Sequence, residues 1–309
     1  MRILIELPTW LGDTVMVTPA IENLVGYFND AEITLIGSFI SIEALKNHPN
    51  VHKIMLINKS YISMYKFARG LGEFDKFFSF RRSWRSNILK LLIKSNQKYQ
   101  FSKTKYQKKH QVDKYNNFIN DCIGQDLSAK SLTVYQDVKL SIDIKTKTVG
   151  INPGASYGNS KRWYPEEFAK VAIELSSKYE IIIFGGIDEV DIALDIERLL
   201  VERGVSNYQN LAGKTSIQEL INIISQLSLF ITGDSGPMHL AASFKIPTIA
   251  IFGPTNDDET SQYGFNKGII VKKNLDCQPC MQRSCPLIHH NCMKLITAAD
   301  VLAAVQMLD

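Results

Sequence analysis

The residues best suited to chemistry lie in the stretch Gly-Asp-Ser-Gly-Pro-Met-His, residues 233–239. An apolar run precedes it and small residues follow it, an order typical of a strand, a tight turn and a helix. The first N–H groups of such a helix lack intrahelical partners and attract anions. Asp234 and His239 are therefore candidates for binding the ribose or phosphates of a nucleotide. The alternative is a plain turn in which Asp234 or Ser235 only caps the helix.

A second candidate anion-binding loop covers residues 152–163, Asn-Pro-Gly-Ala-Ser-Tyr-Gly-Asn-Ser-Lys-Arg-Trp. Its composition suits a diphosphate, because Ser156 and backbone N–H groups can donate hydrogen bonds while Lys161 supplies positive charge. The loop lacks both the Gly-x-Gly-x-x-Gly pattern and the P-loop spacing. Neither a Rossmann dehydrogenase nor a P-loop ATPase is supported.

A carboxylate follows the first apolar run of the chain, in the loop Pro-Thr-Trp-Leu-Gly-Asp at residues 8–13. Asp13 stands at the start of a predicted helix, so it can serve as a helix cap. A carboxylate at the carboxyl end of a parallel strand can also act as a general base. Both interpretations of Asp13 stay open at this point.

Positive charge is concentrated in residues 76–114, which carry a net charge of +11 against −7 for the rest of the chain. Aromatic residues are interleaved with the cations. A nucleic acid, an anionic membrane surface or a phosphorylated glycolipid would each fit this stretch. For the outer lysines we favour simple solvation. Arg81, Arg82 and Arg85 differ, because they directly follow a predicted strand and arginine binds carboxylates and phosphates bidentately.

The length of 309 residues suits two domains. The chain has neither an apolar run long enough to span a membrane nor the pattern of a secretion signal. We expect a cytoplasmic protein, in contact with the inner membrane surface at most, whose five cysteines are mostly reduced.

Short apolar strands alternate with helices along both halves, which predicts two parallel sheets with right-handed crossovers. We place the boundary between residues 146 and 147, inside the weakly patterned segment 133–148. The predicted helices include 14–27, 84–94, 112–122, 165–178, 189–203, 216–226 and 237–244. The predicted strands are 3–7, 32–36, 53–57, 76–80, 148–152, 180–184, 207–211, 229–232 and 248–252.

Four cysteines cluster near the C-terminus, at Cys277, Cys280, Cys285 and Cys292, with His289 and His290 among them. Their residue types suit zinc, but the spacing after the first pair is irregular. A metal site, a local cross-link and simple packing are the three alternatives, and we favour packing over a bound metal.

Taken together, these motifs resemble the ADP-heptose:lipopolysaccharide heptosyltransferases of glycosyltransferase family nine. The shared motifs are Trp-Leu-Gly-Asp at residues 10–13, Pro-Gly-Ala-x-x-Gly-x-x-Lys-Arg-Trp at 153–163, and 233–239. Phe-Gly-Pro-Thr at 252–255 and the cysteine cluster look most like the heptosyltransferase II branch. The resemblance implies the GT-B fold, an α/β architecture of two Rossmann-like parallel-sheet domains facing across a cleft. Residues 1–146 would bind the acceptor and residues 147–309 the nucleotide-sugar donor.

The reaction implied by the resemblance is inverting transfer of L-glycero-D-manno-heptose from ADP-heptose to a heptose of the lipopolysaccharide inner core. Asp13 matches the catalytic base, and Lys161 matches the cation on the donor phosphates. Ser156 matches a phosphate-loop position and Thr215 a residue lining the adenine pocket. Either Asp188 or Glu189 would hold the ribose. The residues matching those around the diphosphate and sugar are Asp234, Ser235, Gly236 and His239.

For the anionic acceptor, our candidates are Arg81, Arg82, Arg85 and His110. The candidate loops contain no Asp-x-Asp pair, so we expect transfer without a metal or other cofactor. We also expect no nucleic-acid partner, because no motif of a known nucleic-acid-binding module accompanies the basic stretch. The alternatives are a sister transferase with a different donor or acceptor sugar, and a non-catalytic nucleotide-sugar binding protein.

Overall fold

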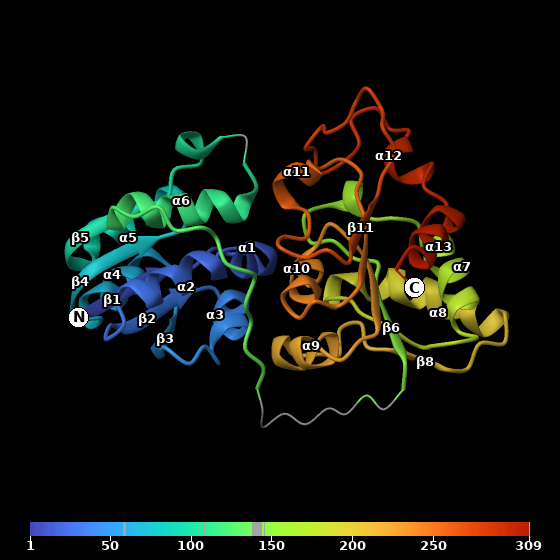
Figure 1. The fold of residues 1–309 in the computed structure, drawn as a ribbon, viewed down its shortest axis with the longest axis horizontal. Helices are drawn as coiled ribbons and strands as arrows, with labels where there is room; N and C mark the ends of the chain where they lie inside the picture. Colours follow the sequence, from blue (N-terminus) through green and yellow to red (C-terminus); the bar gives the residue numbers. More distant parts are fainter. Residues whose placement is uncertain (58–59, 108, 138–143, 145, 309) are drawn as a thin grey trace. The chain divides into compact units, whose positions relative to one another are not determined.

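The computed structural model describes residues 1–57, 60–107, 109–137, 144 and 146–308. The chain divides into two compact units, Met1–Asp137 and Val138–Asp309 (Figure 1). Much of the predicted boundary segment, at residues 138–143 and 145, lies outside the described residues, as does Lys108 of the basic stretch. Among the described residues, no helix has both the length and the apolar character needed to cross a bilayer.

The first unit is built on five parallel strands in the spatial order β3-β2-β1-β4-β5. The strands are β1 (Arg2–Glu6), β2 (Glu32–Gly37), β3 (Val51–Leu56), β4 (Glu73–Ser79) and β5 (Lys94–Gln100). The helices are α1 (Leu11–Met16), α2 (Thr18–Tyr27), α3 (Phe39–Leu45), α4 (Tyr61–Gly70), α5 (Trp84–Leu92) and α6 (Gln111–Ile123), with a 3₁₀ turn at Lys103–Tyr106.

The helices of the first unit form two groups. Helices α4 and α5 pack against each other and against a core cluster that includes Leu4 and Phe77 of the sheet. Helix α1 contacts α3 and α6, and α2 contacts α6. The right-handed crossover rule puts these two groups on opposite faces, because the chain moves outward in both directions from the central strand β1.

The second unit has six parallel strands in the order β11-β10-β9-β6-β7-β8. The strands are β6 (Thr148–Asn152), β7 (Glu180–Ile183), β8 (Tyr208–Asn210), β9 (Leu229–Gly233), β10 (Thr248–Ile251) and β11 (Gly268–Val271). The helices are α7 (Pro165–Leu175), α8 (Val190–Glu202), α9 (Ile217–Ile224), α10 (Gly236–Ser243), α11 (Asp257–Thr260), α12 (Asn291–Lys294) and α13 (Ala298–Gln306), with 3₁₀ turns at Asn159–Lys161 and Ile187–Glu189.

The central strands of this sheet, β6 and β9, are buried along their whole length, as expected for a parallel sheet covered on both faces. Trp163 is the largest fully buried side chain, and its indole N–H donates to the Ile296 carbonyl at 3.0 Å. This contact ties the loop after β6 to the segment that precedes α13. The two parallel α/β units confirm the predicted fold class.

Differences from the prediction include one helix and two edge strands. The predicted helix 14–27 is two helices, because Pro19 lies in the first turn of α2 and cannot donate to a preceding turn. Strand β5 was not predicted, since its sequence Lys-Ser-Asn-Gln-Lys-Tyr-Gln lacks an apolar run. It lies at an edge of the sheet, where a polar strand is tolerated. Strand β11, at an edge of the other sheet, was also missed.

Replacing Gly150 by alanine tests how tightly the second sheet is packed. A Cβ atom at this position would lie 2.5 Å from Leu227, 2.7 Å from Phe230 and 2.8 Å from Phe184. We expect Gly150→Ala to lower the free energy of unfolding by about 1–3 kcal/mol through overpacking, as measured by urea denaturation. In Gly70→Ala, where no described atom lies within 4 Å of the new Cβ, stability should not fall. Equal stability of the two variants would contradict this packing.

Candidate functional site

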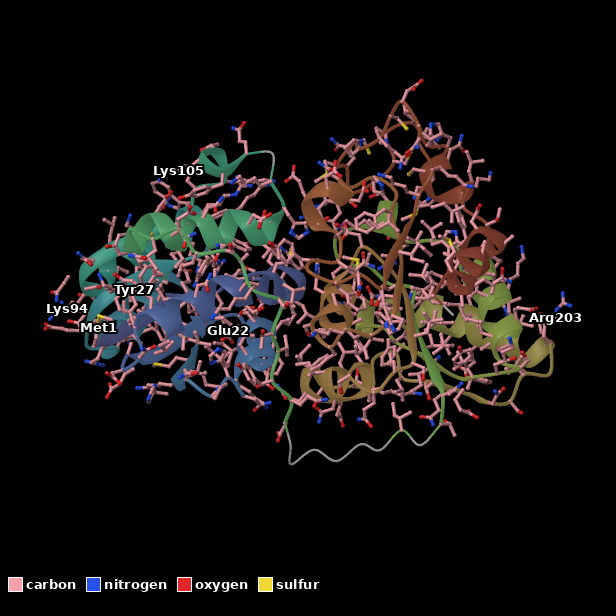
Figure 2. All side chains as sticks on the ribbon, in the orientation of Figure 1. Met1, Glu22, Tyr27, Lys94, Lys105 and Arg203 are labelled. Carbon is pink, nitrogen blue, oxygen red and sulfur yellow. The ribbon has the colours of Figure 1, made fainter. Side chains whose placement is uncertain are left out.

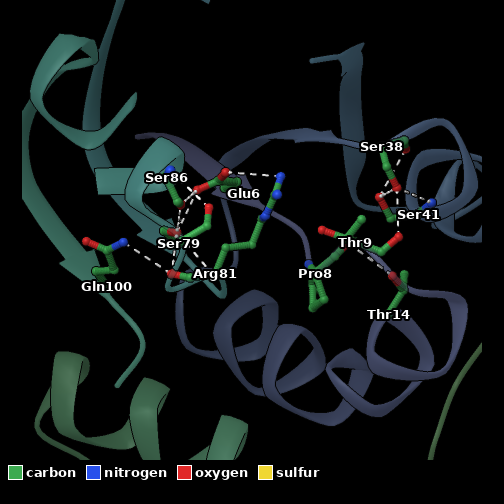
Figure 3. A network of polar contacts seen from close by, with 11 residues as sticks. Glu6, Pro8, Thr9, Thr14, Ser38, Ser41, Ser79, Arg81, Ser86 and Gln100 are labelled. Carbon is green, nitrogen blue, oxygen red and sulfur yellow. Dashed lines mark hydrogen bonds and ion pairs between the residues drawn. The ribbon is translucent and has the colours of Figure 1, made fainter. Parts of the chain in front are cut away.

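Asp13 lies in the first turn of α1, directly after the loop that follows β1. Side-chain hydroxyls hold that loop to its neighbours (Figure 3). The Ser38 hydroxyl donates to the Thr9 carbonyl at 3.0 Å, and the Thr14 hydroxyl donates to the Trp10 carbonyl at 2.9 Å. Asp13 is half-buried and follows a backbone segment fixed at both ends.

The Asp13 carboxylate accepts a hydrogen bond from the hydroxyl of Tyr115, with 3.1 Å between Tyr115 Oη and Asp13 Oδ1. Tyr115 comes from α6 and is buried. Burial, followed by the negative charge of Asp13 and this hydrogen bond, raises the pKa of Tyr115 well above its usual value. The phenol therefore stays protonated and remains a fixed donor to the carboxylate.

Sequence reasoning did not find Tyr115. It lies 102 positions from Asp13 in a helix with an ordinary amphipathic pattern, so no local signal marks it. Gln111, one turn earlier on the same helix, also hydrogen-bonds the phenol. The geometry orients Asp13 as a hydrogen-bond acceptor and a potential base.

The three candidate arginines occupy different environments. The Arg81 guanidinium lies 3.6 Å from the carboxylate of Glu6, which is buried at the end of β1 (Figure 3). The Glu6 carboxylate also accepts hydrogen bonds from the hydroxyls of Ser79, at 2.6 Å, and Ser86. Arg81 thus compensates a buried charge of its own unit.

Arg82 is exposed and Arg85 is half-buried. The positive charge of Arg82 opposes the upward shift of the Tyr115 pKa. His110, the fourth acceptor candidate, is the N-cap of α6, where its Nδ1 accepts from the Val112 N–H at 3.2 Å. Acceptor binding by these residues stays a prediction.

Lys94, Lys105 and Lys109 of the basic stretch are exposed, as we favoured from the sequence, whereas Lys114 is buried in α6. Lys94 and Lys105 extend from the surface of the first unit (Figure 2). Each makes an ion pair on the surface, Lys94 with Glu73 at 3.3 Å and Lys105 with Asp121 at 2.7 Å. Exposed pairs of this kind contribute little stability.

In the second unit the structure brings Lys161 and Asp234 together, with 2.5 Å between Lys161 Nζ and Asp234 Oδ2. The same carboxylate oxygen accepts a hydrogen bond from the Thr255 hydroxyl at 2.7 Å. Asp234 is buried, and Lys161 is largely so and also lies over the ring of Tyr157. These contacts join the loops after β6, β9 and β10, which are neighbouring strands of the sheet.

A second set of contacts ties the loop after β6 to the loop after β9. The Asn152 amide donates to the Gly154 carbonyl at 3.2 Å and to the Thr232 hydroxyl at 3.3 Å. The Ser235 hydroxyl joins this group, 2.9 Å from the Thr232 hydroxyl. Asn152 and Thr232 are buried polar residues at strand ends, and sequence reasoning passed over both.

Glu189 and Asp188, the two ribose candidates, differ clearly in placement. Asp188 is exposed, whereas Glu189 is buried and accepts from the Gly186 N–H at 2.8 Å. The Glu189 carboxylate lies so close to Gly154 that a Cβ atom there would come within 2.0 Å of it. Glu189, and not Asp188, is therefore attached to the loop that carries Lys161.

The remaining candidates lie at the ends of strands or the starts of helices. Ser156 is exposed in the loop after β6, and Thr215 is half-buried just before α9. Gly236 begins α10, and His239 follows in the same helix, buried. The expected turn between β9 and a helix start is confirmed, and Ser235 is the N-cap residue by position, although its side chain makes no capping hydrogen bond.

The cysteine-rich segment, residues 277–292, packs against the Lys161 loop. The Tyr157 hydroxyl donates to the Met281 carbonyl at 2.8 Å, and the Ser160 hydroxyl donates to the Gln282 carbonyl at 2.6 Å. Arg283 approaches so closely that a Cβ atom on Gly158 would lie 2.4 Å from its carbonyl oxygen. Gly158 is required by this contact between two protein segments.

His290 completes the attachment. Its Nε2 lies 2.9 Å from the Ser160 carbonyl oxygen, and its Nδ1 lies 3.2 Å from the Tyr164 hydroxyl. Because a carbonyl oxygen can only accept, Nε2 carries a proton and donates it to Ser160. The histidine thus joins Ser160, inside the 3₁₀ turn that holds Lys161, to Tyr164, the residue before α7.

All five cysteines are free thiols, and Cys277, Cys280, Cys285 and Cys292 line one small cavity together with Ser160 and Pro254. Burial, together with the other three thiols, raises the pKa of Cys292 to about 11, so this thiol is protonated at neutral pH. Within the described ranges, no three His, Cys, Asp or Glu side chains are arranged to hold a metal ion. The thiols pack beneath the Lys161 loop.

Comparison with known proteins decides the family. The model of glycosyltransferase family 9 (heptosyltransferase) matches residues 65–290. The chain belongs to this family. It is 42% identical to lipooligosaccharide heptosyltransferase 2 of Campylobacter jejuni serotype O:2, over 98% of this chain and 96% of that protein. The resemblance drawn from the sequence motifs is confirmed, and the protein is a glycosyltransferase.

Solved structures of the family share the fold. The structure of Escherichia coli ADP-heptose lps heptosyltransferase II matches with a TM-score of 0.84 at 20% identity, covering 100% of this chain and 98% of that one. E. coli heptosyltransferase WaaC with ADP matches with a TM-score of 0.77 at 16% identity, over the full length of both chains. These matches confirm the GT-B fold that we predicted for this chain.

Tyr115→Phe tests whether the hydrogen bond from the phenol favours the charged form of the Asp13 carboxyl group. A hydrogen bond donated to a carboxylate stabilises its charged form, so removing it raises the pKa of Asp13. We expect the acidic limb of the kcat/KM pH profile to move upward by about one pH unit. Tyr99→Phe, which removes a hydroxyl donating to Gln97, is the control and should leave the limb in place. An unchanged limb in Tyr115→Phe would exclude this role.

Gly158→Ala tests the attachment of the cysteine-rich segment to the Lys161 loop. The new Cβ must displace the Arg283 carbonyl and with it the loop. Because this loop is the predicted diphosphate site, we expect ADP to bind roughly tenfold more weakly by calorimetry, and overpacking should also lower the thermal midpoint by a few degrees. Gly70→Ala is the control with normal ADP affinity. Wild-type affinity in Gly158→Ala would show that the loop position does not matter for ADP.

Proposed function

We propose that this protein transfers L-glycero-D-manno-heptose from ADP-heptose to a heptose of the inner core of lipopolysaccharide or lipooligosaccharide, with inversion at the anomeric carbon. The observation that carries the proposal is the Asp13 carboxylate held by the buried phenol of Tyr115. An inverting transfer needs one base and no covalent sugar–enzyme intermediate. The names of relatives in Campylobacter jejuni support the heptosyl group and the acceptor class.

In the proposed mechanism, Asp13 accepts the proton of the acceptor hydroxyl as its oxygen attacks the anomeric carbon. Tyr115 remains protonated and donates throughout, so it keeps the carboxylate in one orientation. The bond from the anomeric carbon to the diphosphate oxygen breaks in the same step, and ADP leaves.

Lys161 would offset the negative charge that develops on the leaving diphosphate. Its ammonium group is paired with Asp234, which fixes the orientation of the cation. Glu189 is the better placed of the two ribose candidates, because it contacts the loop that carries Lys161. We propose that this cation takes the place of a divalent metal and that no cofactor is required.

We propose further that Arg82 and Arg85 bind the anionic acceptor and that Arg81 holds them in place through Glu6. The acceptor is a lipid-linked saccharide, so the protein would work at the cytoplasmic face of the inner membrane. A family member with a different donor or acceptor sugar is the second candidate function. It is favoured by the range of family members in the comparisons, which includes Lipopolysaccharide heptosyltransferase 3 of E. coli.

Asp13→Asn separates catalysis from donor binding. We expect turnover to fall by about 10²–10⁴-fold, because the amide cannot accept the proton, while calorimetric affinity for ADP-heptose stays normal. Asp30→Asn, which changes an exposed carboxylate of the same unit, should keep full turnover. Full activity of Asp13→Asn would refute the proposed base.

An assay of turnover also identifies the donor. ADP-heptose, an ADP-hexose and a uridine-linked sugar are compared by release of the nucleoside diphosphate, with and without a chelator. We expect release from ADP-heptose in both conditions. Release from another donor alone would favour the sister transferase, and loss of activity with chelator would refute the role given to Lys161.

A further inference from the structure

The outward faces of α4 and α5 expose large apolar side chains. Ile62 is 73% exposed and Tyr65 49% on α4, and Trp84 is 74% and Leu91 79% exposed on α5. Burying such groups is normally favourable, so a soluble domain rarely leaves several of them together in water. The two helices pack side by side on one face of the first sheet.

These side chains are not displaced core residues. Both helices already bury an inner face, through Met64 and Ala68 on α4 and Leu89 on α5. On α5, Trp84 and Leu91 are separated by seven positions, which places them on one stripe of the helix. Each helix therefore has two apolar faces, one packed on the sheet and one directed away from it.

The charged side chains of α4 and α5 are all positive. The two helices contain no aspartate or glutamate, and their cations are Lys66, Arg69, Arg85 and Lys90. Helix α8 of the second unit provides a contrast, because Leu194 and Val201 are also exposed and seven positions apart. Its sequence contains four acidic residues and one arginine. Exposed apolar residues and uniform positive charge coincide on α4 and α5 and not on α8.

We propose that the outward face of α4 and α5 docks on a membrane surface that contains anionic lipids. Aliphatic side chains and an exposed tryptophan enter the headgroup region, while lysine and arginine reach lipid phosphates. A second copy of the chain fits less well, because pairing like faces would bring cations against cations. A nucleic acid would not account for the exposed aliphatic side chains of Ile62 and Leu91. This proposal rests on the proposed function, in which the acceptor is a lipid-linked saccharide.

Vesicle flotation tests this surface without acceptor or donor, so the result does not depend on catalysis. The wild-type protein should float with vesicles of phosphatidylcholine plus anionic phosphatidylglycerol, and at least about tenfold less with phosphatidylcholine alone. Trp84→Ser/Leu91→Ser and, separately, Lys66→Glu/Arg69→Glu should each reduce binding to the anionic vesicles by about tenfold or more. Both variants should keep normal turnover on a delipidated acceptor saccharide.

The matched control is Leu194→Ser/Val201→Ser, which removes an equally spaced apolar pair from α8 and should bind vesicles normally. Equal binding by the wild type and both test variants would overturn the proposal, as would absence of wild-type binding. A wild-type dimer that Trp84→Ser/Leu91→Ser converts to a monomer would assign the face to a second copy instead. Loss of turnover on the delipidated acceptor in either variant would also count against a docking role.

Discussion

The contact on which the second unit depends is the ion pair between Lys161 and Asp234. A buried carboxylate is costly unless a cation or hydrogen-bond donors compensate it. Asp234 has both, in Lys161 and Thr255, and the three residues come from loops that follow three neighbouring strands. One carboxylate therefore fixes the positions of three loops at the carboxyl edge of the sheet, the edge at which open α/β sheets bind ligands.

The first unit follows the same physical rule with different residues. Glu6 ends β1, the central strand, and is compensated by Arg81 and by two serine hydroxyls. Ser79 ends the neighbouring strand β4, and Ser86 lies in the helix that follows. In both units a buried acid at the end of a central strand joins neighbouring loops.

The sequence was sufficient to predict a strand or a turn where an apolar run or a glycine turn marks it. Strands β1, β6 and β9 and the turn at residues 233–236 were found from such signals. The polar edge strand β5 could not be found in this way, because its pairing with β4 replaces the missing apolar run. Asp13 and Lys161 were identified from their loops, whereas Tyr115 and His290 depend on contacts between segments that lie more than a hundred positions apart.

At two glycines of the Lys161 loop, atoms of other segments fill the space that a Cβ atom would need. Gly154 faces the carboxylate of Glu189, and Gly158 faces the Arg283 carbonyl. The loop therefore forms one interlocked unit with distant stretches of the chain. For protein engineering, this means that residues 152–163 cannot be transplanted alone into another member of the family. A functional chimera must carry the partner stretches around residues 186–189 and 281–290 as a matched set.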